Sequence, residues 1–146
     1  MIEPDFDNSL KNANILIIDD SIPFQNLTYA MLNKFGVNSI EFALSLSEGL
    51  KKLNYTSSNR SEFVGYDMVL LDINLPDGNG VSGCNFLTHH AGSLDIPVII
   101  ISGVYNPIIV EEVFRLGACD FIQKPFVSAL LKKRLCNVLN GALLEI

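Results

Sequence analysis

The sequence has few basic residues, few cysteines and no long apolar run. Lys and Arg number 10 against 16 Asp and Glu, which gives the 146 residues a net charge of −6. Because the chain has no basic patch to neutralise nucleic-acid phosphates, we do not expect it to bind DNA or RNA directly. No apolar stretch approaches the roughly 20 residues of a membrane span, so we do not expect the chain to enter a membrane.

The cysteines and the missing sequence motifs exclude further kinds of site. Cys84, Cys119 and Cys136 are far apart, odd in number and form no CxxC pair, which predicts reduced thiols rather than a zinc or redox site. Residues 1–5 are acidic and lack the basic and apolar regions of a secretory signal, so we expect a cytoplasmic protein. No GxxxxGKS/T, GxGxxG, GxSxG or HExxH motif occurs, which argues against the common nucleotide-binding, hydrolase and metalloprotease sites.

The apolar residues that are present follow a regular pattern. They make up 49% of the chain, enough for one domain with a substantial core. Segments of helical periodicity alternate with five strand-like segments: Ile15–Ile18, Ser39–Ala43, Met68–Leu71, Val98–Ile101 and Cys119–Ile122. This alternation predicts an α/β fold, a single doubly wound five-stranded parallel sheet with right-handed crossovers and helices on both faces.

Local signals divide the chain further. We expect residues 1–13 to form a loose polar arm and residues 14–146 to form the single domain. The polar segment Asn54–Ser61 is typical of a surface loop, and Lys132–Arg134 is expected on the solvated face of the last helix. The first helix should carry one apolar stripe at helical spacing, made of Phe24, Leu27, Met31 and Phe35.

Four predicted strands lead into a residue that can handle a phosphoryl group or a metal ion. The first leads into Asp19 and Asp20, the third into Asp72, the fourth into Ser102 and the fifth into Lys124. In a parallel α/β sheet these strand ends share one edge, and ligands bind in the crevice outside it. We therefore expect three carboxylates, a hydroxyl and an ammonium group to meet in one pocket.

Such a cluster of carboxylates requires a counter-charge. At a separation of about 4 Å, each pair of carboxylates repels by roughly 4 kcal/mol at an effective dielectric near 20. A hard divalent cation with oxygen ligands, most simply Mg²⁺, removes this repulsion, and Lys124 adds a compact positive charge suited to phosphate. Taken singly, Asp19 and Asp20 could cap a helix and Lys124 could return to solvent, but together the residues predict Mg²⁺-dependent phosphoryl chemistry on an aspartate.

Four segments carry a resemblance to a known family. In chain order they are Ile17–Ser21, Leu70–Gly78, Ile101–Gly103 and Phe121–Phe126. They resemble the response-regulator receiver domain, the CheY-like module of two-component signalling. The similarity extends from Asn14 to the end of the last helix and implies the flavodoxin-like, CheY-like form of the predicted fold.

The resemblance implies a role for each acidic residue. Asp72 would be the phosphoacceptor, attacking the phosphohistidine of a sensor histidine kinase or a histidine phosphotransfer protein. Asp20 would bind Mg²⁺ directly, Asp19 directly or through water, and Asn74 through its backbone carbonyl, with Asp72 completing the metal site. The chain would then be a signalling phosphoacceptor and not an enzyme with a substrate of its own.

The resemblance also implies a switch. Lys124 would pair with the phosphoryl oxygens and Ser102 would hydrogen-bond them, while Phe121 would turn inward behind Ser102. The face made by the fourth helix, fifth strand and fifth helix would then contact a downstream effector, an output domain or a second copy of the chain. Phe121 stands where the family often has Tyr, so it has no phenol with which to bond a partner.

Two other functions and the extent of the protein stay open on the sequence. An aspartate-nucleophile phosphatase of the haloacid-dehalogenase type also uses Asp and Mg²⁺, but it requires a second acid two residues after the nucleophile, where Asn74 stands. A pseudo-receiver would bind partners without phosphorylation, which the intact set of site residues argues against. The chain is either a stand-alone regulator or a receiver from a longer protein, and the apolar residues 142–146 favour a continuing helix or a dimer contact.

Overall fold

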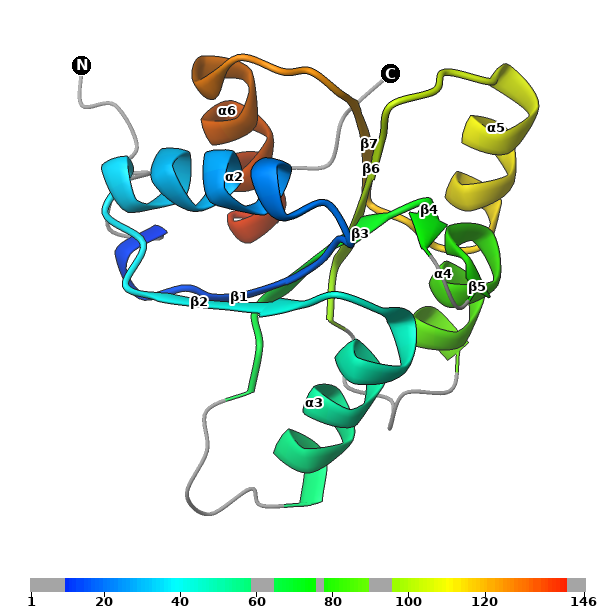
Figure 1. Ribbon diagram of the computed structural model, residues 1–146, viewed down its shortest axis with the longest axis horizontal. Coiled ribbons are helices and arrows are strands. Elements are labelled where there is room, and N and C mark those ends of the chain that lie inside the picture. Colours follow the sequence, from blue (N-terminus) through cyan, green and yellow to red (C-terminus); the bar gives the residue numbers. More distant parts are fainter. Residues whose placement is uncertain (1–9, 59–64, 76–77, 90–95, 142–146) are drawn as a thin grey trace.

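A five-stranded parallel sheet forms the centre of the protein (Figure 1). The structure is a computed structural model that describes residues 10–58, 65–75, 78–89 and 96–141. The strands lie in the order β2 (Ser39–Ala43), β1 (Asn14–Ile18), β3 (Met68–Asp72), β6 (Val98–Ser102) and β7 (Asp120–Gln123). All neighbouring pairs run parallel, which confirms the predicted sheet and fold class.

Helices cover both faces of this sheet. They are α2 (Ile22–Lys34), α3 (Leu46–Ser58), α4 (Gly80–His89), α5 (Pro107–Arg115) and α6 (Ser128–Leu139). Helices α2 and α6 contribute to one core cluster, and α3, α4 and α5 contribute to the other (Figure 1). A short antiparallel pair, β4 (Asn74–Leu75) with β5 (Gly78–Asn79), lies between β3 and α4. Within the described residues, no helix is long and apolar enough to cross a membrane.

The two cores follow from the alternation of side chains along each strand. Every residue of β3 and β6 is buried, as expected for central strands covered on both faces. Successive side chains point to opposite faces, so Leu70 packs in the cluster with α2 and α6, while Leu71 packs with α3, α4 and α5. Each fully buried leucine of this kind contributes about 1.5–3 kcal/mol, and the sheet is thereby a rigid base for the residues at its edges.

The buried face of helix α2 differs from the predicted apolar stripe. Ser21 caps it by accepting a hydrogen bond from the Phe24 amide at 3.3 Å. The predicted stripe included Leu27, which is 45% exposed, whereas Gln25 and Thr28 are buried. Thr28 can be buried because its hydroxyl donates to the Phe24 carbonyl at 2.9 Å, which offsets the loss of water. The stripe prediction is therefore wrong at Leu27, and polar residues take part of the inner face.

Three other expectations need correction. Residues 10–13 do not form a loose arm, because Leu10 and Ala13 are buried in the core with α2 and α6. Helix α3 continues to Ser58 through part of the expected loop, since extending a helix adds one hydrogen bond per residue and tolerates polar side chains. Arg134 does not only face solvent, because its guanidinium donates to the buried carboxylate of Asp120. The apolar segment 142–146 lies outside the described residues.

Candidate functional site

The carboxyl ends of β1 and β3 bring three acidic side chains together, as the sequence predicts. Asp19 and Asp20 directly follow β1, and Asp72 is the last residue of β3. Each can offer one carboxylate oxygen such that all three oxygens lie within 4.8 Å of one another. Asp19 and Asp72 are 2% and 6% exposed, whereas Asp20 faces solvent. The cluster is therefore an acidic site with one side open.

Lys124 reaches this cluster from the end of β7. Its Nζ atom lies 2.8 Å from Asp19 Oδ2 and 3.2 Å from Asp72 Oδ2. The side chain is only 15% exposed, so these ion pairs are shielded from water. Its backbone amide donates to the Ser102 carbonyl at 2.7 Å, and the Lys124–Pro125 peptide is cis. Among the described residues one ammonium group faces three carboxyl groups, so ionisation of all three would leave an excess of negative charge at the site.

Each of the two buried carboxylates is also held by a backbone amide two residues further along the chain. Asp19 Oδ1 accepts a hydrogen bond from the Ser21 amide at 2.9 Å, and Asp72 Oδ1 accepts one from the Asn74 amide at 3.1 Å. An aspartate that bonds the amide two residues later forms an Asx turn, which fixes the direction of its side chain. In both residues the Oδ2 atom is then the one that contacts Lys124.

The protonation of Asp72 reflects its burial. Desolvation raises the pKa of this carboxyl above its ordinary value of 3.8, and the neighbouring charge of Asp19 raises it further. The Asn74 amide and the Lys124 ammonium oppose this rise in the pKa of Asp72 without cancelling it. A buried carboxylate that remains costly to ionise beside a lysine is a strong candidate for a cation-binding or reacting group.

The structure does not place the Ser102 hydroxyl on the acidic cluster. The side chain is buried, donates to the Val104 carbonyl at 2.8 Å and accepts from the Val104 amide at 3.1 Å. Phe121 on β7 is half-buried, and its ring packs edge-to-face against Tyr105 with the ring centroids 6.2 Å apart. A hollow of about 190 Å³ lies nearby, lined by Ile73, Asn74, Val81, Ser102, Val104 and Ile109.

Two residues of α2 contact the site although no sequence pattern singled them out. The buried Gln25 amide donates from Nε2 to the Asp19 carbonyl at 2.6 Å and to the Ala43 carbonyl at 3.3 Å, which ties α2 to the ends of β1 and β2. The centroid of the Phe24 ring lies 4.1 Å from Lys124 Nζ, with the ammonium over the face of the ring. In the sequence, Gln25 could have been noticed only as a polar residue between apolar ones. Phe24 belongs to the predicted apolar stripe, which indicated a core residue and not a contact to the site.

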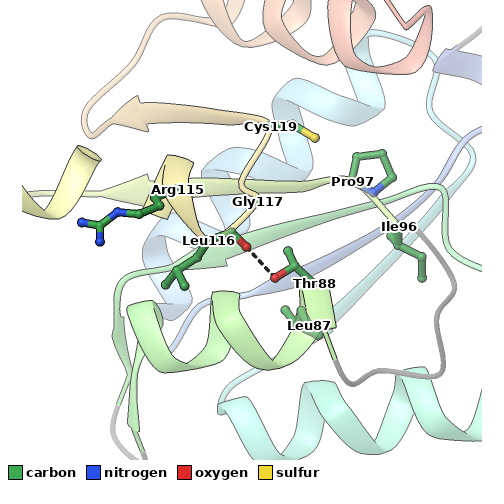
Figure 2. A pocket seen from close by; sticks show the side chains of 8 residues that line it. All are labelled: Leu87, Thr88, Ile96, Pro97, Arg115, Leu116, Gly117 and Cys119. Atoms are coloured by element: carbon green, nitrogen blue, oxygen red, sulfur yellow. Dashed lines mark hydrogen bonds between the residues drawn. The ribbon is translucent and has the colours of Figure 1, made fainter. Parts of the chain in front are cut away.

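A larger hollow lies at the opposite edge of the sheet, near the starts of β6 and β7 (Figure 2). Its volume is about 320 Å³, and its walls come from Leu87, Thr88, Ile96, Pro97, Arg115, Leu116, Gly117 and Cys119. The Thr88 hydroxyl donates to the Leu116 carbonyl across it at 2.7 Å (Figure 2). Within the part of the chain that the structure describes, no carboxylate lines this hollow, in contrast to the acidic site.

The donor set of the acidic site suits a hard cation. Mg²⁺ prefers oxygen ligands and is commonly bound through one or two carboxylates. Asp19, Asp20 and Asp72 supply three carboxylates within the reach of one ion. The residues present therefore fit Mg²⁺, and the excess negative charge beside Lys124 is the feature that a cation would relieve.

Comparisons with known proteins agree with this geometry. Residues 15–136 match the model of the response regulator receiver domain. The chain is 35% identical over 126 residues to a protein-glutamate methylesterase/protein-glutamine glutaminase of Treponema pallidum, covering 82% of this chain and 28% of that protein. It is 31% identical over 132 residues to the two-component response regulator ARR11 of Arabidopsis thaliana, covering 90% of this chain and 23% of that protein. The chain thus spans less than a third of either relative.

Solved structures share the fold. The Vibrio cholerae chemotaxis protein CheY4 superposes with a TM-score of 0.72 at 25% identity, covering 86% of this chain and 98% of that one. A chain of the CheX–CheY–BeF3–Mg²⁺ complex from Borrelia burgdorferi superposes with a TM-score of 0.76 at 27% identity, covering 86% of this chain and 88% of that one.

Proposed function

This chain belongs to the response regulator receiver family, and we propose that Asp72 accepts a phosphoryl group, with Mg²⁺ bound beside it, from a sensor histidine kinase or a histidine phosphotransfer protein. The observation that carries the proposal is the cluster of Asp19, Asp20 and Asp72 with Lys124 inserted between two of them. A buried carboxyl group within reach of a lysine and two further acids matches the requirements of an aspartyl phosphoacceptor.

In the proposed transfer, the two carboxylate oxygens of Asp72 have different roles. Oδ1 is held by the Asn74 amide, which leaves Oδ2 as the nucleophile. Oδ2 forms the new P–O bond as the P–N bond of the phosphohistidine breaks, and the departing imidazole takes up a proton from the solvent. Lys124 lies within reach of Oδ2 and pairs with the oxygens of the incoming group, which stabilises the charge on the transferring phosphoryl group.

Mg²⁺ would be held by the carboxylates of Asp19, Asp20 and Asp72 and by the backbone carbonyl of Asn74. When bound, the ion would neutralise negative charge on the transferring phosphoryl group. The related Borrelia burgdorferi complex, which contains BeF3 and Mg²⁺, supports this assignment. The chain's own contribution is to hold Asp19 and Asp72 in Asx turns, so that little reorganisation accompanies ion binding.

The proposed switch starts at Ser102. Its hydroxyl makes two hydrogen bonds to Val104, and it must give up at least the one that it donates in order to donate to a phosphoryl oxygen. Val104 leads directly to Tyr105, whose ring packs on Phe121, so a shift of this loop disturbs the aromatic pair. Tyr105 is 56% exposed and carries the phenol that Phe121 lacks. The surface formed by α5, β7 and α6 would then present a new contact to an effector, an output domain or a second copy of the chain.

One experiment tests the assignment of Asp72. The Mg²⁺-loaded protein is incubated with acetyl phosphate or beryllofluoride and followed by intact mass and NMR. We expect an adduct in the wild type, its complete loss in Asp72→Asn, and its retention in Asp120→Asn, which removes another buried acid. Steady hydrolysis of a small phosphate ester would instead indicate a phosphatase, and the absence of any Mg²⁺-dependent response would indicate a pseudo-receiver.

The proposal also includes the setting of the domain. We place the protein in the cytoplasm, because the sequence predicts reduced cysteines. A phosphoryl group that comes from a kinase is consistent with the same location. The burial of Leu10 and Ala13 supports a domain that begins a few residues before position 14. Cell fractionation tests the location, and a truncation that removes residues 1–13 tests the boundary, because exposing the Leu10 site should lower the melting temperature.

A further inference from the structure

The Lys124 ammonium has a third contact besides the two carboxylates. Its Nζ atom lies 4.1 Å from the centroid of the Phe24 ring. The face of an aromatic ring carries partial negative charge and attracts a cation within about 6 Å, most strongly where water is excluded. The Lys124 side chain is 15% exposed, so the contact lies in such a shielded place.

The Phe24 ring is itself held in position. The ring of Phe126, which is 7% exposed, meets it edge-to-face with the centroids 5.3 Å apart and the planes at 84°. The Phe24 amide also donates to Ser21 Oγ at the start of α2. The ring therefore lies between the start of α2, which follows Asp20, and the segment that follows Lys124. It connects the part of the site that carries the acids to the part that carries the lysine.

We propose that Phe24 is a positioning residue that keeps the Lys124 ammonium at the phosphoryl subsite; this inference rests on the proposed function. A lysine has a flexible four-carbon stem and is not directed by its own geometry. Its two carboxylate partners are the groups that Mg²⁺ and the phosphoryl group would engage. The ring contact involves neither carboxylate, so it persists when the ion pairs with Asp19 and Asp72 are exchanged for contacts to phosphoryl oxygens.

The test compares two affinities in one set of variants. In Phe24→Leu, which keeps an apolar side chain but removes the ring, we expect the beryllofluoride affinity of the Mg²⁺-loaded protein to fall about tenfold. The Mg²⁺ affinity measured alone should stay near that of the wild type, because carboxylates bind the ion. Phe24→Tyr and Phe24→Trp, which keep a ring face, should restore the beryllofluoride affinity.

Phe42→Leu is the matched control. Phe42 also packs against an aromatic residue, Tyr29, with the ring centroids 6.0 Å apart, but it lies on β2 and contacts none of the site residues in the interactions described above. We expect this variant to lose stability without losing beryllofluoride affinity. If Phe24→Leu does not fold, Phe126→Leu removes the supporting ring and should produce a smaller change in the same direction.

A readout that needs no phosphoryl mimic separates this inference from the proposed function. In the wild type, the Lys124 side-chain protons over the ring should be shifted upfield in NMR, and the shift should disappear in Phe24→Leu. Equal losses of Mg²⁺ and beryllofluoride affinity, or no rescue by Phe24→Tyr, would show that Phe24 only packs. A wild type that retains the upfield shift but binds no mimic would contradict the proposed function instead.

Discussion

The two edges of the sheet treat their acidic residues in opposite ways. At the amino edge, Asp120 begins β7, accepts the Phe121 amide at 2.8 Å and pairs with Arg134, and Asp67 accepts the Asn14 amide at 2.8 Å. At the carboxyl edge, Asp19, Asp20 and Asp72 lie within reach of one ion, and two of them, Asp19 and Asp72, share the ammonium of Lys124. Asp19 and Asp72 accept backbone amides as well, so the difference between the edges lies in the crowding of the acids. Three carboxylates that lie close together repel each other when ionised, which favours a further cation at the carboxyl edge.

The volume of the hollows does not indicate which edge carries the acidic site. The larger hollow, about 320 Å³, lies at the amino edge, where the described lining residues include no carboxylate (Figure 2). The acidic site lies at the other edge, beside a smaller hollow of about 190 Å³. The charge imbalance is therefore the better guide to the functional edge of this molecule, because it specifies a chemistry that empty volume alone does not.

The largest expected effect comes from removing the cation of each edge in turn. Lys124→Gln should slow phosphoryl uptake from acetyl phosphate by about 100-fold, as loss of a single charge-stabilising donor commonly does. Arg134→Gln should leave the uptake rate near that of the wild type, because its partner Asp120 lies at the amino edge. Quenched time courses of the mass adduct measure both rates. Similar losses in both variants would remove the functional distinction between the edges.

Mg²⁺ should stabilise the folded protein through the acids of the carboxyl edge and not through those of the amino edge. At 100 times its dissociation constant, the ion should raise the free energy of unfolding by about 2.7 kcal/mol, because it binds the folded chain. Asp20→Asn should abolish most of this gain while changing the metal-free protein little, since Asp20 is exposed. Asp67→Asn, which alters an acid at the amino edge, should keep the full gain. Urea unfolding with and without Mg²⁺ provides the measurement.

Neutralising one buried acid at each edge should change metal-free stability with opposite signs. Asp120→Asn should lower the free energy of unfolding by about 2 kcal/mol, because it weakens charged hydrogen bonds to Arg134 and the Phe121 amide. Asp72→Asn should raise it, since burial raises the pKa of Asp72 and so makes its ionised form costly in the folded protein. Chemical unfolding at pH 7 decides between these signs, and destabilisation by both would contradict the contrast.

The smallest expected effect is a pH dependence at Asp72. A carboxyl whose folded-state pKa is raised binds its proton more tightly when folded, so its stabilising contribution is present below its ordinary pKa of 3.8. That contribution is lost as the pH rises through the folded-state pKa. Relative to Asp72→Asn, the metal-free wild type should lose stability as the pH rises above about 4, and the loss should level off once the pH has passed the folded-state pKa of Asp72. A flat difference or a gain over this range would refute the prediction.

Much of the scaffold was predictable because it depends on local patterns. Continuous apolar runs predicted the buried central strands. The rule that parallel strands share a carboxyl edge then brought Asp19, Asp20 and Asp72 together correctly. Local patterns failed where a polar group could be satisfied by folding, as at Thr28, or where an apparent arm residue found a core, as at Leu10.

By itself, the sequence determined the order of strands and helices and which residues reach the carboxyl edge, since hydrophobic periodicity and strand direction are encoded over a few neighbouring positions. Only the tertiary structure decided how those residues meet. It places Lys124 between Asp19 and Asp72 with Phe24 beneath it, turns Ser102 toward Val104 and gives Asp120 the partner Arg134. Most of these contacts join residues far apart in the chain, and packing sets the direction of each side chain, which no local pattern contains.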